Sequence, residues 1–362
     1  MLLLVTHETR YDYAPPVATA QHMAHLKPLA TASQQLLRHA LRIAPEPAQR
    51  SESVDVFGNT RAFFAFESTH DQLVVTAESV VQTEEPALPP AALRAQPWEE
   101  VRERFRYRIG VHDDPASEFV FPSTHVPLHD DFVAYARASF TPGRALFDAV
   151  LDLTRRMYID FDYDSGSTEI NTPAVQALAQ RRGVCQDFSH IMIACLRNLG
   201  LAARYVSGYL LTQPPAGQPR LIGADASHAW VELYLPPLRD EADASVVEDG
   251  HAVGGEWVGF CPTNGRQPGE DYVKLAVGRD FADVSPMRGI LHGGARHVLD
   301  VGVTVMPFAE MSMQQQQQWL PGQSQSQTQR PANTADSAAR ARDAAPPLSQ
   351  QGASVQSQSQ LG

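Results

Sequence analysis

The sequence is poor in cysteine, with only Cys185, Cys195 and Cys261 in 362 residues. An odd and small number of cysteines argues against a disulfide framework of the kind found in small secreted proteins. The apolar run at residues 1–8 is too short for the core of a signal peptide and lacks a basic leader, so it predicts an opening strand. We therefore expect a cytoplasmic protein.

Long apolar runs and positive charge are also scarce. No stretch approaches the roughly 20 consecutive apolar residues that a membrane helix needs. The 29 Lys and Arg residues are outnumbered by 41 Asp and Glu, which gives a formal net charge of −12. A duplex-binding protein normally carries a basic stripe, and the sequence shows none. We expect neither a nucleic acid nor a membrane as partner.

The proportions of hydrophobic and charged residues are typical of a globular protein. Hydrophobic residues make up 43% and charged residues 19%, which is enough to bury a core, and the length fits two domains. Residues 1–85 are rich in β-branched and aromatic strand segments and predict a β-sandwich-like N-terminal domain. Residues 86–97, rich in Pro and Ala, read as a linker.

The second domain is predicted over residues 98–310. Helical patterns dominate its first half, and strands follow at 204–210, 228–235, 256–261 and 297–306. From residue 311 to 362 the chain is rich in Gln and Ser and cannot bury a core, so it is predicted to be a disordered tail.

Cys185 is the residue with the clearest chemical potential. It follows directly after a glycine break, in Gly183–Phe188, and opens a predicted helix. A thiol at a helix N-terminus meets unpaired N–H groups and the positive end of the dipole, and both favour the reactive thiolate. Cys195 falls on the apolar face of the same helix and is expected to be a buried structural cysteine.

His228 is the predicted partner of this thiol. It lies where a loop becomes a strand with clear alternation of apolar residues, at Ala229, Val231 and Leu233. A rigid strand edge is a good place to hold a general base.

Four segments in this order resemble the bacterial transglutaminase-like superfamily, relatives of eukaryotic transglutaminases and papain-type enzymes. They are Gly183–Phe188, Ala203–Tyr209, Asp225–Trp230 and Cys261–Asn264. The resemblance covers about residues 1–306, since the first domain is similar to the β-rich region that accompanies this core in bacteria. It implies an α+β fold with a papain-like core of helices packed on an antiparallel sheet.

The resemblance also implies an activity, in which Cys185 is the nucleophile and His228 the general base. The thiolate attacks a carboxamide of a protein or peptide substrate, ammonia or an amine leaves, and an amine or water resolves the thioester. Thiolate and imidazolium would stabilise each other as an ion pair. The backbone N–H of Cys185 is one expected donor to the oxyanion. No cofactor is implied.

One position departs from the family, whose third site residue is an aspartate that orients the histidine. That position is Cys261 here. If strands 228–235 and 256–261 pair in antiparallel fashion, residue 261 lies near His228. A neutral thiol is a weak acceptor and would hold the imidazole poorly.

Three explanations are open. In the first, another residue orients His228, and the candidates are Asn264, Asp225 and Glu232. In the second, Cys261 itself does so as a thiolate. In the third, the site has lost catalysis and the chain serves as a protein-interaction module.

Two further possibilities involve the sulfurs of Cys185 and Cys261. Cys185, His228 and Cys261 form a ligand set seen at catalytic zinc, although short-spaced Cys/His pairs are lacking and we expect no metal. A reversible disulfide between Cys185 and Cys261 is the other.

Overall fold

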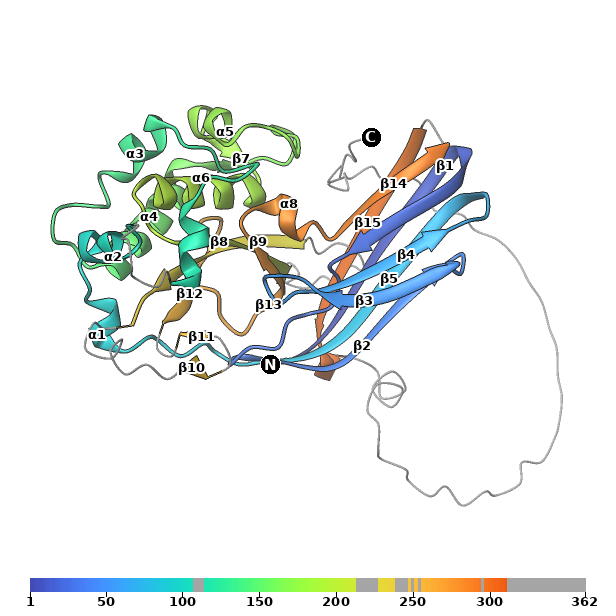
Figure 1. Cartoon of the computed structure of the whole chain (residues 1–362), viewed down its shortest axis with the longest axis horizontal. Coiled ribbons are helices and arrows are strands. Elements are labelled where there is room, and N and C mark those ends of the chain that lie inside the picture. The colour runs from blue at the N-terminus through green and yellow to red at the C-terminus, as the bar shows by residue number, and fades with distance from the viewer. Residues whose placement is uncertain are drawn as a thin grey trace, which may run out of the picture.

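The described part of the computed structural model contains two large β-sheets, one strongly curved and one covered by helices (Figure 1), and two small sheets of two strands each. The predicted α+β class is thereby confirmed. The predicted tail lies outside the described residues, as does most of the acidic segment that joins strands 228–235 and 256–261. The structure describes residues 1–106, 114–212, 227–237, 247–248, 251–252, 255–293 and 296–310.

The first sheet is built around one long strand. The N-terminal part of the chain contributes five antiparallel strands in the order β2-β5-β1-β4-β3: β1 (Leu2–Ala24), β2 (Gln34–Ala44), β3 (Gln49–Val54), β4 (Thr60–Phe66) and β5 (His70–Thr83). The pairing of β1 with β5 is irregular between Asp12 and Val17, around Pro15 and Pro16, which lack the N–H needed for a ladder. Beyond this point β1 pairs with β4, and the sheet bends into a half-barrel (Figure 1).

Two strands from the far end of the chain complete this sheet. β14 (Met287–Gly293) and β15 (Arg296–Pro307) both pair with β1. The predicted extent of the second domain, 98–310, is therefore wrong at its end. The predicted strand at 297–306 exists, but it joins the first sheet, since alternation specifies a strand and not the sheet that it joins. Its Val303 and Val305 pack in a cluster that includes Tyr209, Val273 and Leu275 of the core sheet.

The second sheet and its helices form the core. The sheet is antiparallel in the order β12-β9-β8-β13: β8 (Ala203–Leu210), β9 (Ser227–Leu235), β12 (Glu256–Phe260) and β13 (Tyr272–Gly278). The central helix, α6 (Cys185–Asn198), is buried along nearly its whole length. Its Ile191 and Leu196 pack with Val231 and Leu233 of β9 in one apolar cluster.

Shorter elements surround this core. The predicted linker includes one turn of helix, α1. None of the described helices combines the length and apolar character needed to cross a membrane. The remaining elements are α1 (Ala91–Arg94), α2 (Trp98–Arg104), η1 (Pro115–Val120), α3 (Asp130–Ala136), α4 (Leu146–Asp160), β6 (Asp162–Tyr163), α5 (Ala174–Gln180), β7 (Arg182–Gly183), β10 (Val247–Glu248), β11 (His251–Ala252), α8 (Phe281–Val284) and η2 (Phe308–Glu310).

Two amide side chains of the first domain close the free edge of β13. Asn59, which is buried, donates to the carbonyl of Val277 over 2.7 Å and accepts from its N–H over 2.8 Å. Gln34 makes the same pair of contacts with Lys274, both at 2.7 Å. These contacts replace a neighbouring strand, because an edge strand otherwise leaves its backbone groups unpaired.

Candidate active site

The nucleophile candidate is placed by the first turn of α6. Cys185 is the first residue of this helix, and Asp187 accepts a hydrogen bond of 2.9 Å from the N–H of Val184, the residue before it. In a capping box, this is the hydrogen bond in which the third residue of the helix accepts from the backbone N–H of the N-cap residue. A Cβ atom on Gly183 would lie 2.6 Å from Oδ2 of Asp187, so the capping carboxylate needs a glycine at this position.

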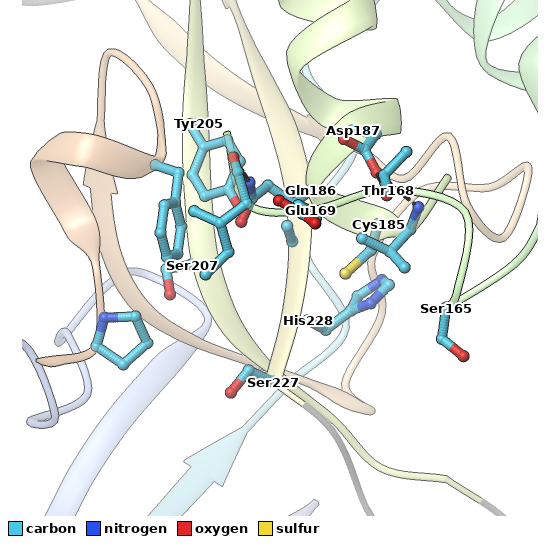
Figure 2. A pocket seen from close by; sticks show the side chains of 15 residues that line it. Ser165, Thr168, Glu169, Cys185, Gln186, Asp187, Tyr205, Ser207, Ser227 and His228 are labelled. Carbon is cyan, nitrogen blue, oxygen red and sulfur yellow. Dashed lines mark hydrogen bonds between the residues drawn. The ribbon is translucent and has the colours of Figure 1, made fainter. Parts of the chain in front are cut away.

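The same turn also fixes a loop above the thiol. The hydroxyl of Thr168 donates to Asp187 over 2.7 Å, and Nε2 of Gln186 donates to the carbonyl of Ile170 over 3.1 Å. Loop and helix together enclose a cavity of about 90 Å³ that Cys185 and His228 both line (Figure 2). In Figure 2 the sulfur of Cys185 points toward the imidazole of His228.

His228 is held by the core sheet. It lies opposite Gly208 in the pairing of β8 with β9, and its ring packs between Trp230 and Tyr272 with centroids 6.2 and 5.7 Å away. The backbone N–H of Ala229, the next residue, forms a hydrogen bond with the Cys185 sulfur. Nucleophile and base are therefore neighbours in the folded chain.

The predicted position of Cys261 is confirmed. β9 and β12 pair in antiparallel fashion, and Nε2 of His228 lies 3.2 Å from Sγ of Cys261. This contact leaves Nδ1 as the imidazole nitrogen available to Cys185.

Cys261 is surrounded by hydrogen-bond donors. The hydroxyl of Tyr272 and the backbone N–H groups of Thr263 and Asn264 interact with its fully buried sulfur, and the Asn264 N–H also donates to the Cys261 carbonyl over 3.3 Å. Nδ2 of Asn264 donates to the Tyr272 oxygen over 2.7 Å, so the single hydroxyl proton of Tyr272 is directed to the sulfur. The sulfur is thus placed as an acceptor, and Asn264 acts one step away from His228.

The other predicted orienting residues have different surroundings. Both carboxylate oxygens of the buried Glu232 are engaged, one by Arg204 at 2.7 Å and the other by Lys274. Burial acts to raise the pKa of Glu232, but these two cations outweigh it and lower the pKa. Glu232 is therefore an ionised member of a buried charge cluster. Asp225 lies outside the described residues.

Burial decides the charge of the two reacting groups. It raises the pKa of Cys185 to about 12 and lowers the pKa of His228 to about 4. At neutral pH the resting pair is therefore an uncharged thiol and an uncharged imidazole. Desolvation therefore opposes the ion pair expected at the helix N-terminus, since it outweighs the donors around the sulfur.

A metal site is not supported by the described residues. Among them, no group of three or more His, Cys, Asp and Glu side chains is arranged to hold an ion. Cys185, Cys195 and Cys261 are free thiols, and Cys195 is buried within α6 as expected.

Two contributors to the site were not predicted. Tyr272 begins β13, at the opposite edge of the sheet from β12, and reaches Cys261 beside His228 and Trp230, which its ring contacts; no local pattern marks it. Thr168 belongs to a loop whose closeness to Asp187 depends on the packing of α5 and α6.

Comparison with known proteins agrees with this arrangement. Residues 3–82 match the family described as "Bacterial transglutaminase-like N-terminal region", and residues 133–260 match the "Transglutaminase-like superfamily". An uncharacterised protein of Mycobacterium tuberculosis is 40% identical over 309 residues, 84% of this chain and 92% of that protein. One from Mycobacterium leprae is 30% identical over 306 residues, 84% of this chain and 98% of its own.

A solved structure shares the fold. It is a protein of Cytophaga hutchinsonii provisionally described as a cysteine protease, with a TM-score of 0.61 and 22% identity. The match covers 84% of this chain and 90% of the other. At this level of identity the likeness concerns the fold alone. Together, the family matches and the relatives show that this chain belongs to the transglutaminase-like superfamily, in the form that carries the bacterial N-terminal region before the core.

Proposed function

We propose that this protein is a cysteine acyltransferase that acts on carboxamide groups of proteins or peptides, by transamidation or by hydrolysis. One observation carries the proposal: Cys185 begins a buried helix beside His228, whose Nε2 is held by residue 261. The other imidazole nitrogen is then directed to the only thiol that lines the cavity.

The neutral resting pair favours general-base catalysis. As the sulfur of Cys185 bonds to the amide carbon, Nδ1 of His228 takes the thiol proton. The negative charge on the former carbonyl oxygen is stabilised by free N–H groups in the first turn of α6, with the N–H of Cys185 as the first candidate. The imidazolium then returns the proton to the departing nitrogen, and a thioester is left. An amine or water, deprotonated by His228, breaks the thioester.

Cys261 replaces the aspartate as an acceptor in this scheme. With donors from Tyr272 and from two backbone N–H groups aimed at its sulfur, an N–H at Nε2 of His228 is the complementary partner. This contact fixes the tautomer that has its lone pair at Nδ1. A sulfur acceptor stabilises imidazolium less than a carboxylate does, so the proposed enzyme works with an impaired orienting group.

A second function rests on a specific observation. A thiol replaces the orienting aspartate at position 261, and burial favours the uncharged forms of Cys185 and His228. A superfamily member that has lost catalysis would show both features. In that case the chain is a protein-interaction module that keeps the fold.

A screen with glutamine-containing peptides and a fluorescent amine separates the two. For an enzyme we expect amine incorporation or ammonia release, lost in both Cys185→Ser and His228→Ala. Cys195→Ala is the matched control, a buried cysteine in the same helix, and should retain activity. Absence of turnover with every peptide, together with no thioester adduct by mass spectrometry, would favour the module.

The cytoplasm is the proposed compartment, because all three cysteines are free and reduced thiols are typical there. Cell fractionation with an antibody against the chain tests this.

A further inference from the structure

A second cavity adjoins the catalytic one. It measures about 440 Å³, and Ile170 and Phe281 line both cavities. One wall comes from the core and the other from β1, β4 and β14 of the first domain, through Met23, Phe63 and Ile290. The two domains therefore line two adjoining cavities, here called the recess, the first of which contains Cys185.

The walls of this recess carry unusually exposed apolar groups. Ile290 is 65% exposed, and Phe63 and Met23 are half-buried. A group of large apolar side chains around a hollow is typical of a binding site. The polar side chains Asn171 and Gln21 also line it.

The catalytic cavity is too small for more than the reacting group. Its volume of about 90 Å³ is smaller than that of a cavity of roughly 150 Å³ that holds one benzene molecule. A carboxamide and its neighbouring carbons fill such a space, so the remainder of a substrate has to extend elsewhere. The shared wall of Ile170 and Phe281 leads to the larger cavity.

An edge strand borders the larger cavity. Among the described residues, β14 pairs with β1 alone, so the backbone groups along its other side are not engaged in a ladder. Such an edge can accept an extended peptide as an added strand, with side-chain pockets beside it.

We infer that the substrate is an extended polypeptide segment in which a large apolar side chain flanks the reactive residue and occupies the cavity between the domains. The inference rests on the proposed function for the position of the reactive residue. The first domain is then part of the specificity site.

Binding to an inactive chain tests this without turnover. Full-length Cys185→Ala is titrated with fluorescent peptides that have a central glutamine and either Leu or Ser at each neighbouring position. We expect the best Leu peptide to bind at least about tenfold more tightly than its Ser counterpart, the scale of small differences in an apolar pocket. Ile290→Ser should remove most of this preference.

Val298→Ser is the matched control, since Val298 is 62% exposed on β15, the next strand along the chain, and does not line the cavity. It should leave the preference intact. Equal affinities for Leu and Ser peptides, or a preference unchanged by Ile290→Ser, would overturn the inference. So would light scattering that shows dimers broken by Ile290→Ser, because a second copy would then cover this surface.

Activity of the unsubstituted chain separates this inference from the proposed function. Turnover of a small glutamine derivative without a preference for apolar neighbours rejects the inference and leaves the acyltransferase standing. A preference in binding without turnover of any substrate rejects the acyltransferase and assigns the recess to a peptide-binding module.

Discussion

At the scale of single residues, the surroundings of Cys261 suit a carboxylate. The Tyr272 hydroxyl and the N–H groups of Thr263 and Asn264 already point to its side chain. In Cys261→Asp these donors would hold an aspartate that accepts from Nε2 of His228. Loss of an orienting aspartate costs about 10⁴ in rate in serine proteases, so we expect the reverse change to raise kcat at least about tenfold.

Amide turnover by the purified variant measures this effect. A double variant that also contains Cys185→Ser should be inactive, which excludes a contaminating enzyme. If Cys261→Asp folds normally and turns over no faster than the native chain, the sulfur is not what limits orientation of His228.

Tyr272 is expected to act through Cys261. Tyr272→Phe keeps the ring that packs on His228 and Trp230 but removes the proton directed to the sulfur. We expect kcat to fall about tenfold with little change in KM, because orientation matters mainly in the transition state. Tyr135→Phe, which removes a hydroxyl bonded to Asp160 at 2.9 Å, serves as control and should leave kcat unchanged. Equal kcat values for the two variants would contradict this role.

The pH dependence of Cys185 alkylation reports the charge state of the resting pair. Because burial raises the pKa of Cys185 to about 12, the thiolate fraction should rise about tenfold per pH unit between pH 6.5 and 9. Iodoacetamide labelling followed by mass spectrometry should show the same steady rise. A rate that is already maximal near pH 7, and that is lost in His228→Ala, would instead demonstrate an ion pair.

Local sequence is sufficient to predict a site residue when its role follows from the helix or strand that contains it. Cys185 was predicted from a glycine break before a helix, and the contact of Cys261 with His228 from strand pairing. Tyr272 could not be found in this way, because its contact depends on the side-by-side packing of four strands. The sequence shows the helix start, which favours the expected ion pair, but not the depth of burial, which opposes it.

At the scale of elements, the start of α6 depends on Gly183. A Cβ atom there would lie 2.6 Å from Oδ2 and 2.8 Å from Cβ of Asp187. In Gly183→Ala we expect Asp187 to be displaced and the first turn to shift, with a loss of about 1–3 kcal/mol in stability and lower activity. Gly166→Ala, where the nearest atom is 3.6 Å away, is the control for thermal unfolding. Similar melting temperatures for both variants would show that the cap tolerates a methyl group.

Elements with strong periodicity could be predicted, but not all of their partners. The antiparallel pair of β9 and β12 agrees with the predicted pairing of strands 228–235 and 256–261. The strand β15 was also expected near its true position, yet it was assigned to the core. Its alternating pattern suits either sheet. It joins the first sheet because β1, which lies far away in the sequence, offers a free edge there.

At the scale of the whole molecule, buried histidines make stability sensitive to acid. Burial lowers the pKa of His7, His22 and His228 to about 4. Between pH 6.5 and 4 the unfolded chain binds protons that the folded chain does not, so stability is complete above pH 6.5 and is lost as pH falls. Each histidine contributes up to about 1.4 kcal/mol per pH unit.

Urea unfolding at pH 7, 6 and 5 measures this loss. His22→Leu should reduce the slope with pH, because neither ring nitrogen of His22 has a hydrogen-bond partner among the described residues. A free energy of unfolding that is constant from pH 7 to 5 would show that these histidines take up protons in the native state as readily as in the unfolded state.

The long strand β1 has a consequence for biosynthesis. Leu3 pairs with Pro307 and Ala14 with Arg296, so about 300 residues are translated between the two partners of this ladder. At roughly 5–20 residues per second, the nascent strand waits on the order of 15–60 s with one side unpaired. Such an edge invites intermolecular pairing, and slower growth at low temperature or a co-expressed holdase chaperone should therefore increase the yield of native protein.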